Sequence, residues 1–272
     1  MIKGKRILCT GAGGSIGSEL TRQLCVNNTV FLFDNNETAT FDLYEELKLK
    51  GFQVDYRVGD IRNRDTVREV FVGFKPQIVF HVAAYKHVSP NERYPREAVE
   101  TNLIGLLNVL DEAKGCRFVF ISSDKAIHSN SVMGTTKRIG ELIVKNWGGV
   151  SVRFGNVLGS RGSVIPLWQA SIDRGEPLNV TDEKMTRFFM TLEEAVSLVI
   201  EAGEQGNPGE ILVLKMGEEV NILELAKSII KKSGKDVEIK MIGIRPGEML
   251  FEKLMTPLEE AKKVDKGNYY VI

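Results

Sequence analysis

Short hydrophobic runs alternate with longer amphipathic stretches over the first 155 residues of the chain. Six runs have the length and the near-continuous hydrophobicity of strands that are buried on both faces: 6–9, 29–33, 53–57, 78–82, 117–122 and 150–154. Five stretches between them have helical periodicity: 15–25, 37–50, 64–73, 95–113 and 133–147. Strands that alternate with helices in this way predict an α/β fold with a parallel central sheet.

The pattern is less regular after residue 160. Loops are predicted at 159–162 and 175–177. Three elements then resume the alternation: a helix at 191–204, a strand at 211–215 and a helix at 221–234. The final segment, 237–272, contains short strands, a Pro-Gly turn and a short helix. This change predicts a second, smaller unit that follows the first one without a flexible linker.

The charge balance and the length of the chain narrow its function. The 272 residues contain 36 Lys and Arg against 36 Asp and Glu, so bulk electrostatics do not favour a nucleic acid as partner. No apolar run approaches 18 residues and the first residues lack the pattern of a signal peptide, so we expect a cytoplasmic protein without a membrane contact. The three cysteines lack the spacing of metal ligands, which predicts buried thiols and no metal site.

A glycine-rich loop follows the first predicted strand and opens the first predicted helix. Gly11 permits the sharp turn, Gly14 lets a pyrophosphate approach bare backbone, and Gly17 lets the helix pack closely on the sheet. The start of the helix adds free N–H groups and a positive dipole end. The pattern predicts a dinucleotide-binding loop made by Gly11, Gly13, Gly14, Ser15, Ile16 and Gly17.

Acidic residues follow the second and third predicted strands. Asp34 lies about 20 residues beyond the glycine loop, where a carboxylate binds the ribose hydroxyls of adenosine and favours NAD over NADP, and Asn35 lies beside it. Asp60 and Ile61 are placed to contact the adenine edge. Structural alternatives remain for both carboxylates, because Asp34 also suits a turn and Asp60 also suits a helix cap. We expect NAD as the cofactor, with NADP as the alternative.

Further motifs follow in a defined order along the chain. They are Phe33–Glu37, Gly59–Arg62, His81–Val88, Thr101–Gly105, Ser123–Ala126, Met133–Lys137, Arg153–Ser163, Met185–Phe188 and Arg245–Glu248. Together with the glycine loop they resemble the extended short-chain dehydrogenase/reductase superfamily, and within it the UDP-N-acetylglucosamine 4,6-dehydratases of polysaccharide biosynthesis. The resemblance implies a Rossmann-type doubly wound parallel sheet at 1–160, with a returning segment at about 190–235, and a small C-terminal α/β substrate lobe at 161–272.

The resemblance also extends the expected cofactor site. It implies further contacts at Ala83, Ala84, Lys86 and Asn102. It assigns Lys137 to the nicotinamide ribose, as the last residue of a motif that is normally Tyr-x-x-x-Lys and whose Tyr exchanges a proton with the substrate. Met133 stands at the Tyr position here and cannot titrate. The chain is therefore either a Tyr-less relative that only binds NAD, or a member of the dehydratase branch that carries Met together with an Asp-Lys pair.

That pair is present as Asp124 and Lys125, directly after Ser123. The resemblance implies elimination of water without net redox change: oxidation at carbon 4 of the hexose, removal of the carbon 5 proton by Lys125, protonation of the departing carbon 6 hydroxyl by Asp124, and hydride return to carbon 6. Ser123, coupled through Lys137 or a water molecule, is our candidate acceptor for the 4-hydroxyl proton. A surface salt bridge is the alternative reading of Asp124 and Lys125.

Polar residues outside this catalytic set are assigned to the nucleotide sugar by the resemblance. Arginines offer planar donors for phosphate or uridine hydroxyls, and an asparagine and a glutamate suit the diphosphate and the ribose. The expected set is Lys86, His87, Asn156, Arg161, Arg187, Arg245 and Glu248. A surface ion pair is the alternative for each arginine, and a turn role is the alternative for His87. His81 lies inside an apolar strand, where we expect a core histidine.

Three functions fit these residues. A UDP-N-acetylglucosamine 4,6-dehydratase, which is a lyase, uses both Met133 and the Asp-Lys pair. A UDP-hexose 4-epimerase shares the fold and the cofactor but ordinarily requires the Tyr, and a non-catalytic NAD-binding sensor or scaffold has no need of the Asp-Lys pair. Segment 127–131 departs from the dehydratase pattern, so the identity of the hexose stays open. We expect a UDP-sugar as partner and a homo-oligomer that pairs through the helices at 95–113 and 133–147, as relatives do.

Overall fold

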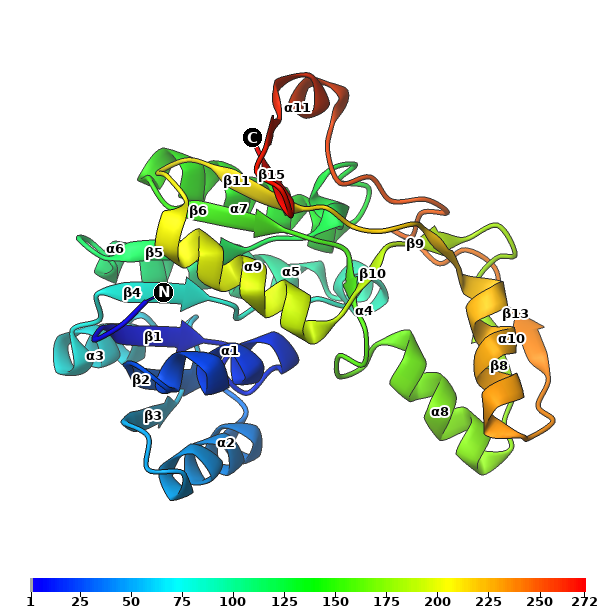
Figure 1. The fold of residues 1–272 in the computed structure, drawn as a ribbon, viewed down its shortest axis with the longest axis horizontal. Coiled ribbons are helices and arrows are strands. Elements are labelled where there is room, and N and C mark those ends of the chain that lie inside the picture. The colour runs from blue at the N-terminus through cyan, green and yellow to red at the C-terminus, as the bar shows by residue number, and fades with distance from the viewer. Residues whose placement is uncertain (1) are drawn as a thin grey trace.

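The computed structural model describes residues 2–272 of the chain. Within these residues, nine strands form a large sheet in the spatial order β14-β15-β11-β6-β5-β4-β1-β2-β3 (Figure 1). Neighbours from β3 to β11 pair in parallel, and β15 pairs antiparallel with β11. The expected Rossmann-type doubly wound sheet is thus confirmed. Its strands are β1 (Arg6–Thr10), β2 (Thr29–Asp34), β3 (Val54–Val58), β4 (Ile78–His81), β5 (Arg117–Ile121), β6 (Val150–Arg153), β11 (Ile211–Leu214), β14 (Val264–Asp265) and β15 (Tyr269–Val271).

Helices cover both faces of the sheet, because successive side chains of a buried strand point to opposite faces. Ile7 and Cys9 of β1 pack into one apolar core, and Leu8 packs into the other. The helices over the first core are α1 (Ser15–Cys25), α2 (Glu37–Leu49) and α9 (Leu192–Gln205). The helices over the second core are α3 (Arg64–Phe74), α6 (Gly105–Glu112) and α7 (Val132–Trp147).

The helix expected at 95–113 is present, but it contains a π-helical turn. It runs through α5 (Pro95–Val99), the π-helical segment η1 (Glu100–Ile104) and α6, and the short helix α4 (Val88–Arg93) precedes it. A π turn holds more residues than an α turn and so changes which side chains face inward. Asn102 of η1 is buried, and its side chain bonds both the backbone of Tyr85 and the hydroxyl of Thr136 on α7.

A small lobe stands apart from the large sheet (Figure 1). Its main elements are α8 (Val164–Arg174), β8 (Leu178–Val180), α10 (Ile222–Ser233) and β13 (Ile239–Met241). They enclose a separate core around Trp168, Ile172 and Val180. The sequence pattern did not predict α8, whose first turn contains Pro166. Proline is tolerated there because the N–H groups of a first turn have no partner within the helix.

The lobe and the sheet divide at different residues from those expected. The segment expected to return to the sheet ran to about 235, but α10 buries Ile222 and Ala226 in the core of the lobe. Strands β14 and β15, expected in the lobe, extend the large sheet and cover the otherwise open edge of β11. Two short strand pairs lie between sheet and lobe: β7 (Asn156–Val157) with β10 (Phe189–Met190), and β9 (Thr186–Arg187) with β12 (Val220–Asn221).

A buried ion pair fastens the C-terminal segment to the sheet. Arg153, at the end of β6, is fully buried and donates to the two oxygens of Glu141 on α7 at 2.9 and 2.8 Å. It also donates to Glu259 of α11 (Pro257–Lys262) at 3.1 Å and to the carbonyl of Leu254 at 2.9 Å. A buried charge is tolerated only when it is paired and hydrogen-bonded. Arg153 therefore holds α7 and α11 together.

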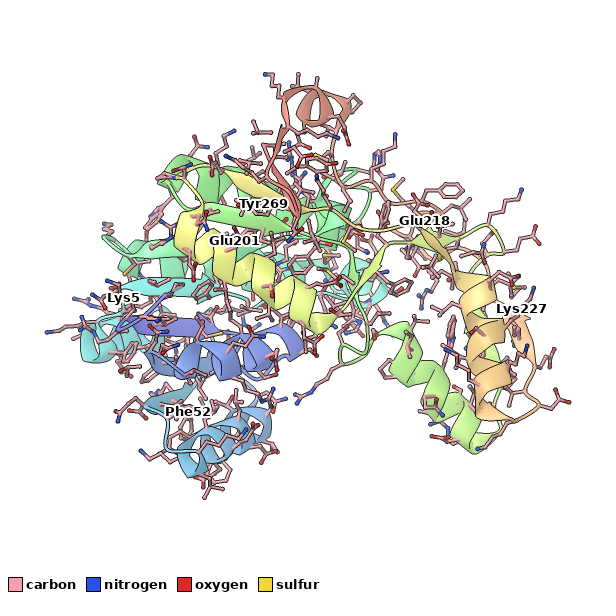
Figure 2. All side chains as sticks on the ribbon, in the orientation of Figure 1. Lys5, Phe52, Glu201, Glu218, Lys227 and Tyr269 are labelled. Carbon is pink, nitrogen blue, oxygen red and sulfur yellow. The ribbon has the colours of Figure 1, made fainter. Side chains whose placement is uncertain are left out.

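The last strand is attached to α9 as well. The Tyr269 hydroxyl of β15 donates to Glu201 at 3.2 Å, and Figure 2 labels both side chains. This contact joins the C-terminal end of the described chain to the helix layer over the first core. None of the helices within residues 2–272 combines the length and the hydropathy that crossing a lipid bilayer requires.

His81 of β4 lies in the core, which confirms the sequence-based expectation. Its Nδ1 lies 3.0 Å from the Thr10 hydroxyl, and its ring stacks with Phe118 and Phe120. Burial, reinforced by the nearby Lys137 ammonium, lowers the pKa of His81 from 6.5 to about 3. Between these values the unfolded chain binds a proton at this position that the folded chain does not bind, so stability rises with pH.

We therefore expect the free energy of unfolding to fall as the pH drops below 6.5 toward 3. A His81→Gln variant should lose this dependence, so the slopes of the two proteins should differ by up to about 1.4 kcal/mol per pH unit. Urea unfolding of both proteins between about pH 4.5 and about pH 6.5 measures the slopes. Parallel pH dependences would contradict the assignment, whatever the absolute stability of the variant.

Candidate functional site

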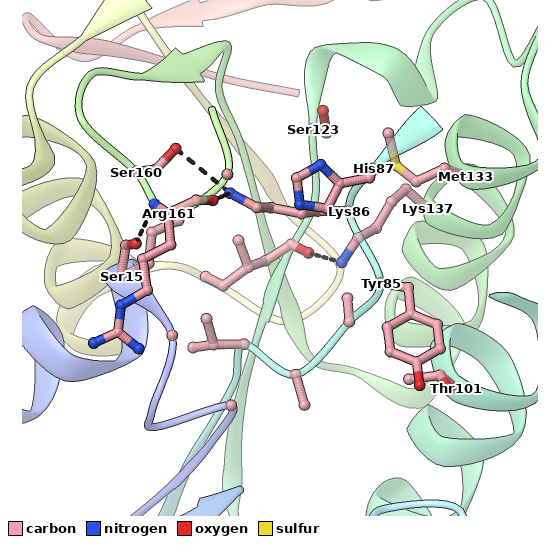
Figure 3. A pocket seen from close by; sticks show the side chains of 18 of the residues that line it. Ser15, Tyr85, Lys86, His87, Thr101, Ser123, Met133, Lys137, Ser160 and Arg161 are labelled. Carbon is pink, nitrogen blue, oxygen red and sulfur yellow. Dashed lines mark hydrogen bonds between the residues drawn. The ribbon is translucent and has the colours of Figure 1, made fainter. Parts of the chain in front are cut away.

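A cavity of about 800 Å³ opens at the carboxyl ends of the parallel strands (Figure 3). The glycine loop, the segments that follow β2, β3, β4 and β5, the start of α7 and the loop at 160–163 line it. Ligands of open α/β folds bind at this edge of the sheet. Residues expected at a cofactor, at catalytic groups and at a sugar nucleotide therefore share one cavity.

The glycine loop has the backbone that its sequence predicted. Gly11 has a φ of +71°, and a Cβ at this position would lie 2.5 Å from the backbone nitrogen of Ala83. A Cβ at Gly17 would lie 2.1 Å from the Gly11 carbonyl oxygen, so the helix packs against the loop as closely as glycine permits. Gly14 is the N-cap of α1, and no side chain caps the helix. The first turn can therefore offer N–H groups to an anion in the cavity.

Asp34 has the turn role considered for it and also lines the cavity. One carboxylate oxygen accepts from the Gly13 N–H at 2.9 Å, and the other accepts from the Asn36 N–H at 2.8 Å. The residue also lines the cavity beside Asn35. The carboxylate thus fixes the glycine loop and faces the space in which an adenosine ribose would lie. The uncapped start of α1, the bare backbone of the glycine loop and the Asp34 carboxylate that faces the cavity together fit a dinucleotide.

Asp60 and Ile61 also line the cavity. Asp60 does not cap the next helix, because the Asn63 side chain does so by accepting from the Thr66 N–H at 3.0 Å. Asp60 instead accepts from the backbone and the guanidinium of Arg62, with a shortest distance of 2.6 Å. The residue therefore fixes Arg62, which does not itself line the cavity.

Met133 and Lys137 lie one turn apart on α7 and both line the cavity. Lys137 is buried, and its ammonium donates to the carbonyl of Ile121 at 2.7 Å and lies 4.8 Å from the ring centre of Phe120. Burial lowers the pKa of Lys137 to about 8, and the charge of Glu141 opposes this shift. Met133 cannot titrate, so position 133 cannot supply the proton transfer that a Tyr would supply there.

Ser123, Asp124 and Lys125 follow β5 and form a hydrogen-bonded group. The Ser123 hydroxyl donates to Asp124 at 2.7 Å, and the Lys125 ammonium donates to the same oxygen at 3.1 Å. Lys125 also donates to the side-chain oxygen of Asn156 at 3.3 Å. Ser123, Lys125 and Asn156 line the cavity, whereas Asp124 is fully buried beneath them with one oxygen unpartnered. The Asp-Lys pair is therefore an internal ion pair and not one on the surface.

The tight approach of α7 to this group follows from a glycine. A Cβ at Gly134 would lie 2.3 Å from the carbonyl oxygen of Lys125. The Ser131 side chain starts the helix by accepting from the Gly134 N–H at 3.0 Å. The start of α7 thereby lies against the backbone of Lys125, and both Met133 and Lys125 line the cavity.

The loop that contains Arg161 crosses to the glycine loop (Figure 3). The Arg161 guanidinium donates to the Gly13 carbonyl at 2.8 Å, and its backbone N–H donates to the Ser15 hydroxyl at 2.9 Å. The Lys86 ammonium donates to the Arg161 carbonyl at 2.7 Å, and burial lowers its pKa. Arg161, expected at the sugar nucleotide, is thus placed at the dinucleotide end. His87 lines the cavity beside Gly162.

Several expected site residues lie outside the wall of the cavity. Arg187 is buried and donates to the carbonyls of Met249 and Leu250 at 2.7 and 3.0 Å. Arg245 forms an ion pair with Glu248. Asn102, Gly13 and Gly17 do not line the cavity either. Ala83 and Ala84 line it, as expected for cofactor contacts.

One residue near the catalytic group was missed by the sequence analysis. Glu252 is buried, and its carboxylate lies 3.9 Å from the Lys125 ammonium. It belongs to the segment between β13 and α11, far from residue 125 in the sequence. The position of Glu252 in the sequence, four residues after Glu248, does not predict this contact. The contact forms only because the C-terminal segment returns to the sheet.

A family model described as polysaccharide biosynthesis protein matches residues 7–272. The chain belongs to this family. It is 44% identical to the capsular polysaccharide biosynthesis protein CapD of Staphylococcus aureus, over 97% of this chain and 48% of that protein. It spans about half the length of the first curated relatives that it matches.

Two other proteins are similar over most of their own length. A protein named UDP-glucose 4-epimerase from Rickettsia canadensis is 35% identical, over 100% of this chain and 84% of that protein. The solved structure of Pen from Bacillus thuringiensis superposes with a TM-score of 0.94 and 37% identity, over 99% of this chain and 89% of that one. The fold is also that of solved structures named UDP-glucose 4-epimerase and dTDP-glucose 4,6-dehydratase, each of which superposes with a TM-score of 0.81.

Asp34 offers a test of the dinucleotide site. An Asp34→Asn variant keeps one acceptor oxygen but removes the charge that faces the ribose, so we expect NAD affinity to fall about tenfold or more and the preference over NADP to shrink. Calorimetric titration with each dinucleotide measures both effects. Asp55→Asn, at an exposed position on β3, is the matched control and should leave both affinities unchanged. Equal NAD affinity in the Asp34 variant and the parent would overturn the assignment.

Proposed function

We propose that the chain is an NAD-dependent nucleotide-sugar 4,6-dehydratase that converts UDP-N-acetylglucosamine into a UDP-4-keto-6-deoxy sugar. The observation that carries this proposal is that Lys125, paired with Asp124, and the non-titrating Met133 line the same cavity. Membership of the polysaccharide biosynthesis family and the similarity to CapD support it.

The glycine loop, Asp34 and Lys137 would hold the NAD. When bound, the nicotinamide supplies the chemistry of reversible hydride transfer, which lets the sugar be oxidised and reduced within one catalytic cycle. Lys137 would bind the nicotinamide ribose, because its ammonium is fixed at the end of β5 by the Ile121 carbonyl. Its low pKa, about 8, leaves it near its titration point at neutral to mildly basic pH.

Three side chains would move the protons of the reaction. Lys125 removes the proton from carbon 5, which a ketone at carbon 4 makes acidic. The 4-hydroxyl proton, which is released as the hydride leaves carbon 4, passes through the Ser123 hydroxyl to the Asp124 carboxylate 2.7 Å away. Asp124 then returns this proton along the same path to the departing carbon 6 hydroxyl. Proton transfers of this kind contribute about 10²–10⁴-fold each to a rate.

Two other functions remain as alternatives to this proposal. A UDP-hexose 4-epimerase is favoured by the similarity to the Rickettsia canadensis protein of that name. That reaction returns the hydride to carbon 4 and needs no base at carbon 5, so Lys125 would have no function in it. In a non-catalytic NAD-binding sensor or scaffold, neither Lys125 nor Asp124 would have a catalytic function.

Incubation with UDP-N-acetylglucosamine and a catalytic amount of NAD tests the reaction. We expect mass spectrometry to show loss of one water without accumulation of NADH. Lys125→Ala and Asp124→Asn should lower the rate by about 10²–10⁴-fold while NAD binding is retained. Met133→Ala should have a smaller effect than Lys137→Ala, because a methionine only shapes the cavity.

The product of this incubation distinguishes the dehydratase from the epimerase and from the non-catalytic sensor. A product of unchanged mass with an altered carbon 4 proton in its NMR spectrum would replace the dehydratase by the epimerase. Unchanged substrate, together with normal NAD binding, would favour the sensor. Retention of water loss in the Lys125 variant would refute the assigned base.

We also infer that the protein is a homo-oligomer and that it acts in the cytoplasm. Apolar side chains on neighbouring turns of α6 and α7 are exposed, among them Leu107, Ile139 and Leu142. They surround a shallow hollow next to Trp147, which suits the packing of helices from a second copy. Cys9, Cys25 and Cys116 are free thiols, which fits a reducing compartment.

Leu142→Glu should shift the protein toward the monomer in light scattering coupled to size-exclusion chromatography, because a carboxylate cannot be buried in an apolar interface without a partner. Leu49→Glu on α2 is the matched control, since Leu49 is an exposed leucine on a helix of the opposite face. The control should keep the mass of the parent. A Leu142 variant with the same mass as the parent would rule out this face.

A further inference from the structure

Glu252 is a buried carboxylate that the reaction described above does not use. It has 6% of its surface exposed and does not line the cavity. Its Oε1 lies 3.9 Å from the Lys125 ammonium and 3.8 Å from the Arg187 guanidinium. The side chain is therefore enclosed between two cations, one of which reaches the cavity and one of which does not.

Arg187 explains how Glu252 is held there. Its guanidinium donates to the carbonyls of Met249 and Leu250, which lie just before Glu252 in the chain. The segment that bears the carboxylate is thus bound by the same arginine that faces the carboxylate. Arg187 was expected to bind the nucleotide sugar, but in the structure its guanidinium binds the backbone of the segment that carries Glu252.

Three separate segments meet at the Lys125 ammonium. Asp124 contacts it from the end of β5 at 3.1 Å, Asn156 contacts it from β7 at 3.3 Å, and Glu252 approaches from the C-terminal segment at 3.9 Å. Lysine has a long, flexible side chain, and a base must be held in one place to act on a single carbon. Of these three contacts, all between residues that the structure describes, only that of Glu252 comes from the C-terminal segment.

We propose that Glu252 is a positioning residue for Lys125, which it holds in the cavity and whose ammonium form it stabilises once the carbon 5 proton has been taken up. This role in elimination rests on the dehydratase function proposed above. The proton moves from carbon 5 to the Lys125 nitrogen, and the electron pair left behind expels the carbon 6 hydroxyl. Glu252 gains and loses no atom in this step. It acts through Lys125 and does not touch the sugar.

The surrounding charges make this role specific to Glu252. Asp124 faces Lys125 from its own segment, Arg187 faces Glu252 from β9, and Glu248 lies in the electrostatic range of Glu252. Burial raises the pKa of Glu252, the Lys125 charge lowers it, and the Asp124 charge raises it again. The two cations oppose the effect of burial, and the Glu252 carboxylate faces Lys125 and Arg187 and not solvent.

The first experiment needs no turnover. Competitive acetylation at about pH 8, read by mass spectrometry of the peptide that contains Lys125, reports how much of that side chain is unprotonated and accessible. Glu252→Gln keeps the size of the side chain and removes its charge, so we expect Lys125 to react several-fold faster. Glu260→Gln, at a surface position on α11, is the control and should react like the parent. An unchanged rate at Lys125 in the Glu252 variant would overturn the proposal.

The second experiment separates the steps of the reaction. In Glu252→Gln we expect oxidation at carbon 4 to proceed, so that absorbance near 340 nm rises and persists, while water loss and deuterium uptake at carbon 5 slow by about tenfold or more. Glu252→Asp, which restores the charge, should recover part of the rate. A general defect of folding would lower all three signals together and would not be rescued, which would count against a positioning role.

The two experiments distinguish a failure of the dehydratase function from a failure of the positioning role. If the parent protein loses no water from the sugar nucleotide, the dehydratase function fails, and the acetylation result still decides whether Glu252 controls Lys125. If the parent loses water and Glu252→Gln does so equally fast without accumulating NADH, the dehydratase stands and the positioning role is refuted.

Discussion

A single buried arginine connects the parts of the molecule that build the cavity. Arg153 has no exposed surface, and its charge is shared by Glu141 and Glu259. Glu141 lies one turn beyond Lys137 on α7, so the helix that lines the cavity is anchored to β6 next to its functional face. Glu259 begins the return of the chain to the sheet. Because removal of either carboxylate would leave part of a buried charge unpaired, both elements are bound to the same point.

The charges of the site are balanced locally, as those of the chain are balanced overall. Thirty-six basic residues match thirty-six acidic ones in the sequence, and Lys125 and Arg187 match Asp124 and Glu252 beside the cavity. A protein that binds anionic ligands would ordinarily be expected to carry a surplus of positive charge. Here the uncapped start of α1 and a few hydrogen-bonded cations would bind the anions instead. An N–H group that points at an anion acts at short range, so no surplus of positive charge is needed.

The sheet and the glycine loop could be predicted because their signals are local: continuous apolar runs identify buried strands, and the spacing of Gly11, Gly14 and Gly17 identifies the turn. Other features depend on distant partners. The π turn at 100–104 is explained only by the buried bonds of Asn102, and α10 belongs to the lobe because its apolar face completes that core. Arg187 and Arg245 were placed by resemblance, whereas the structure shows them bound to backbone carbonyls and to Glu248. Glu252 reaches Lys125 only through tertiary packing.

The bridge from Arg161 to Gly13 and Ser15 joins two loops that are far apart in the sequence and that both line the cavity. The loop that contains Arg161 leads directly into α8 of the lobe. A displacement of the glycine loop is therefore passed on to the segment that carries the lobe, so the two ends of the cavity are mechanically connected.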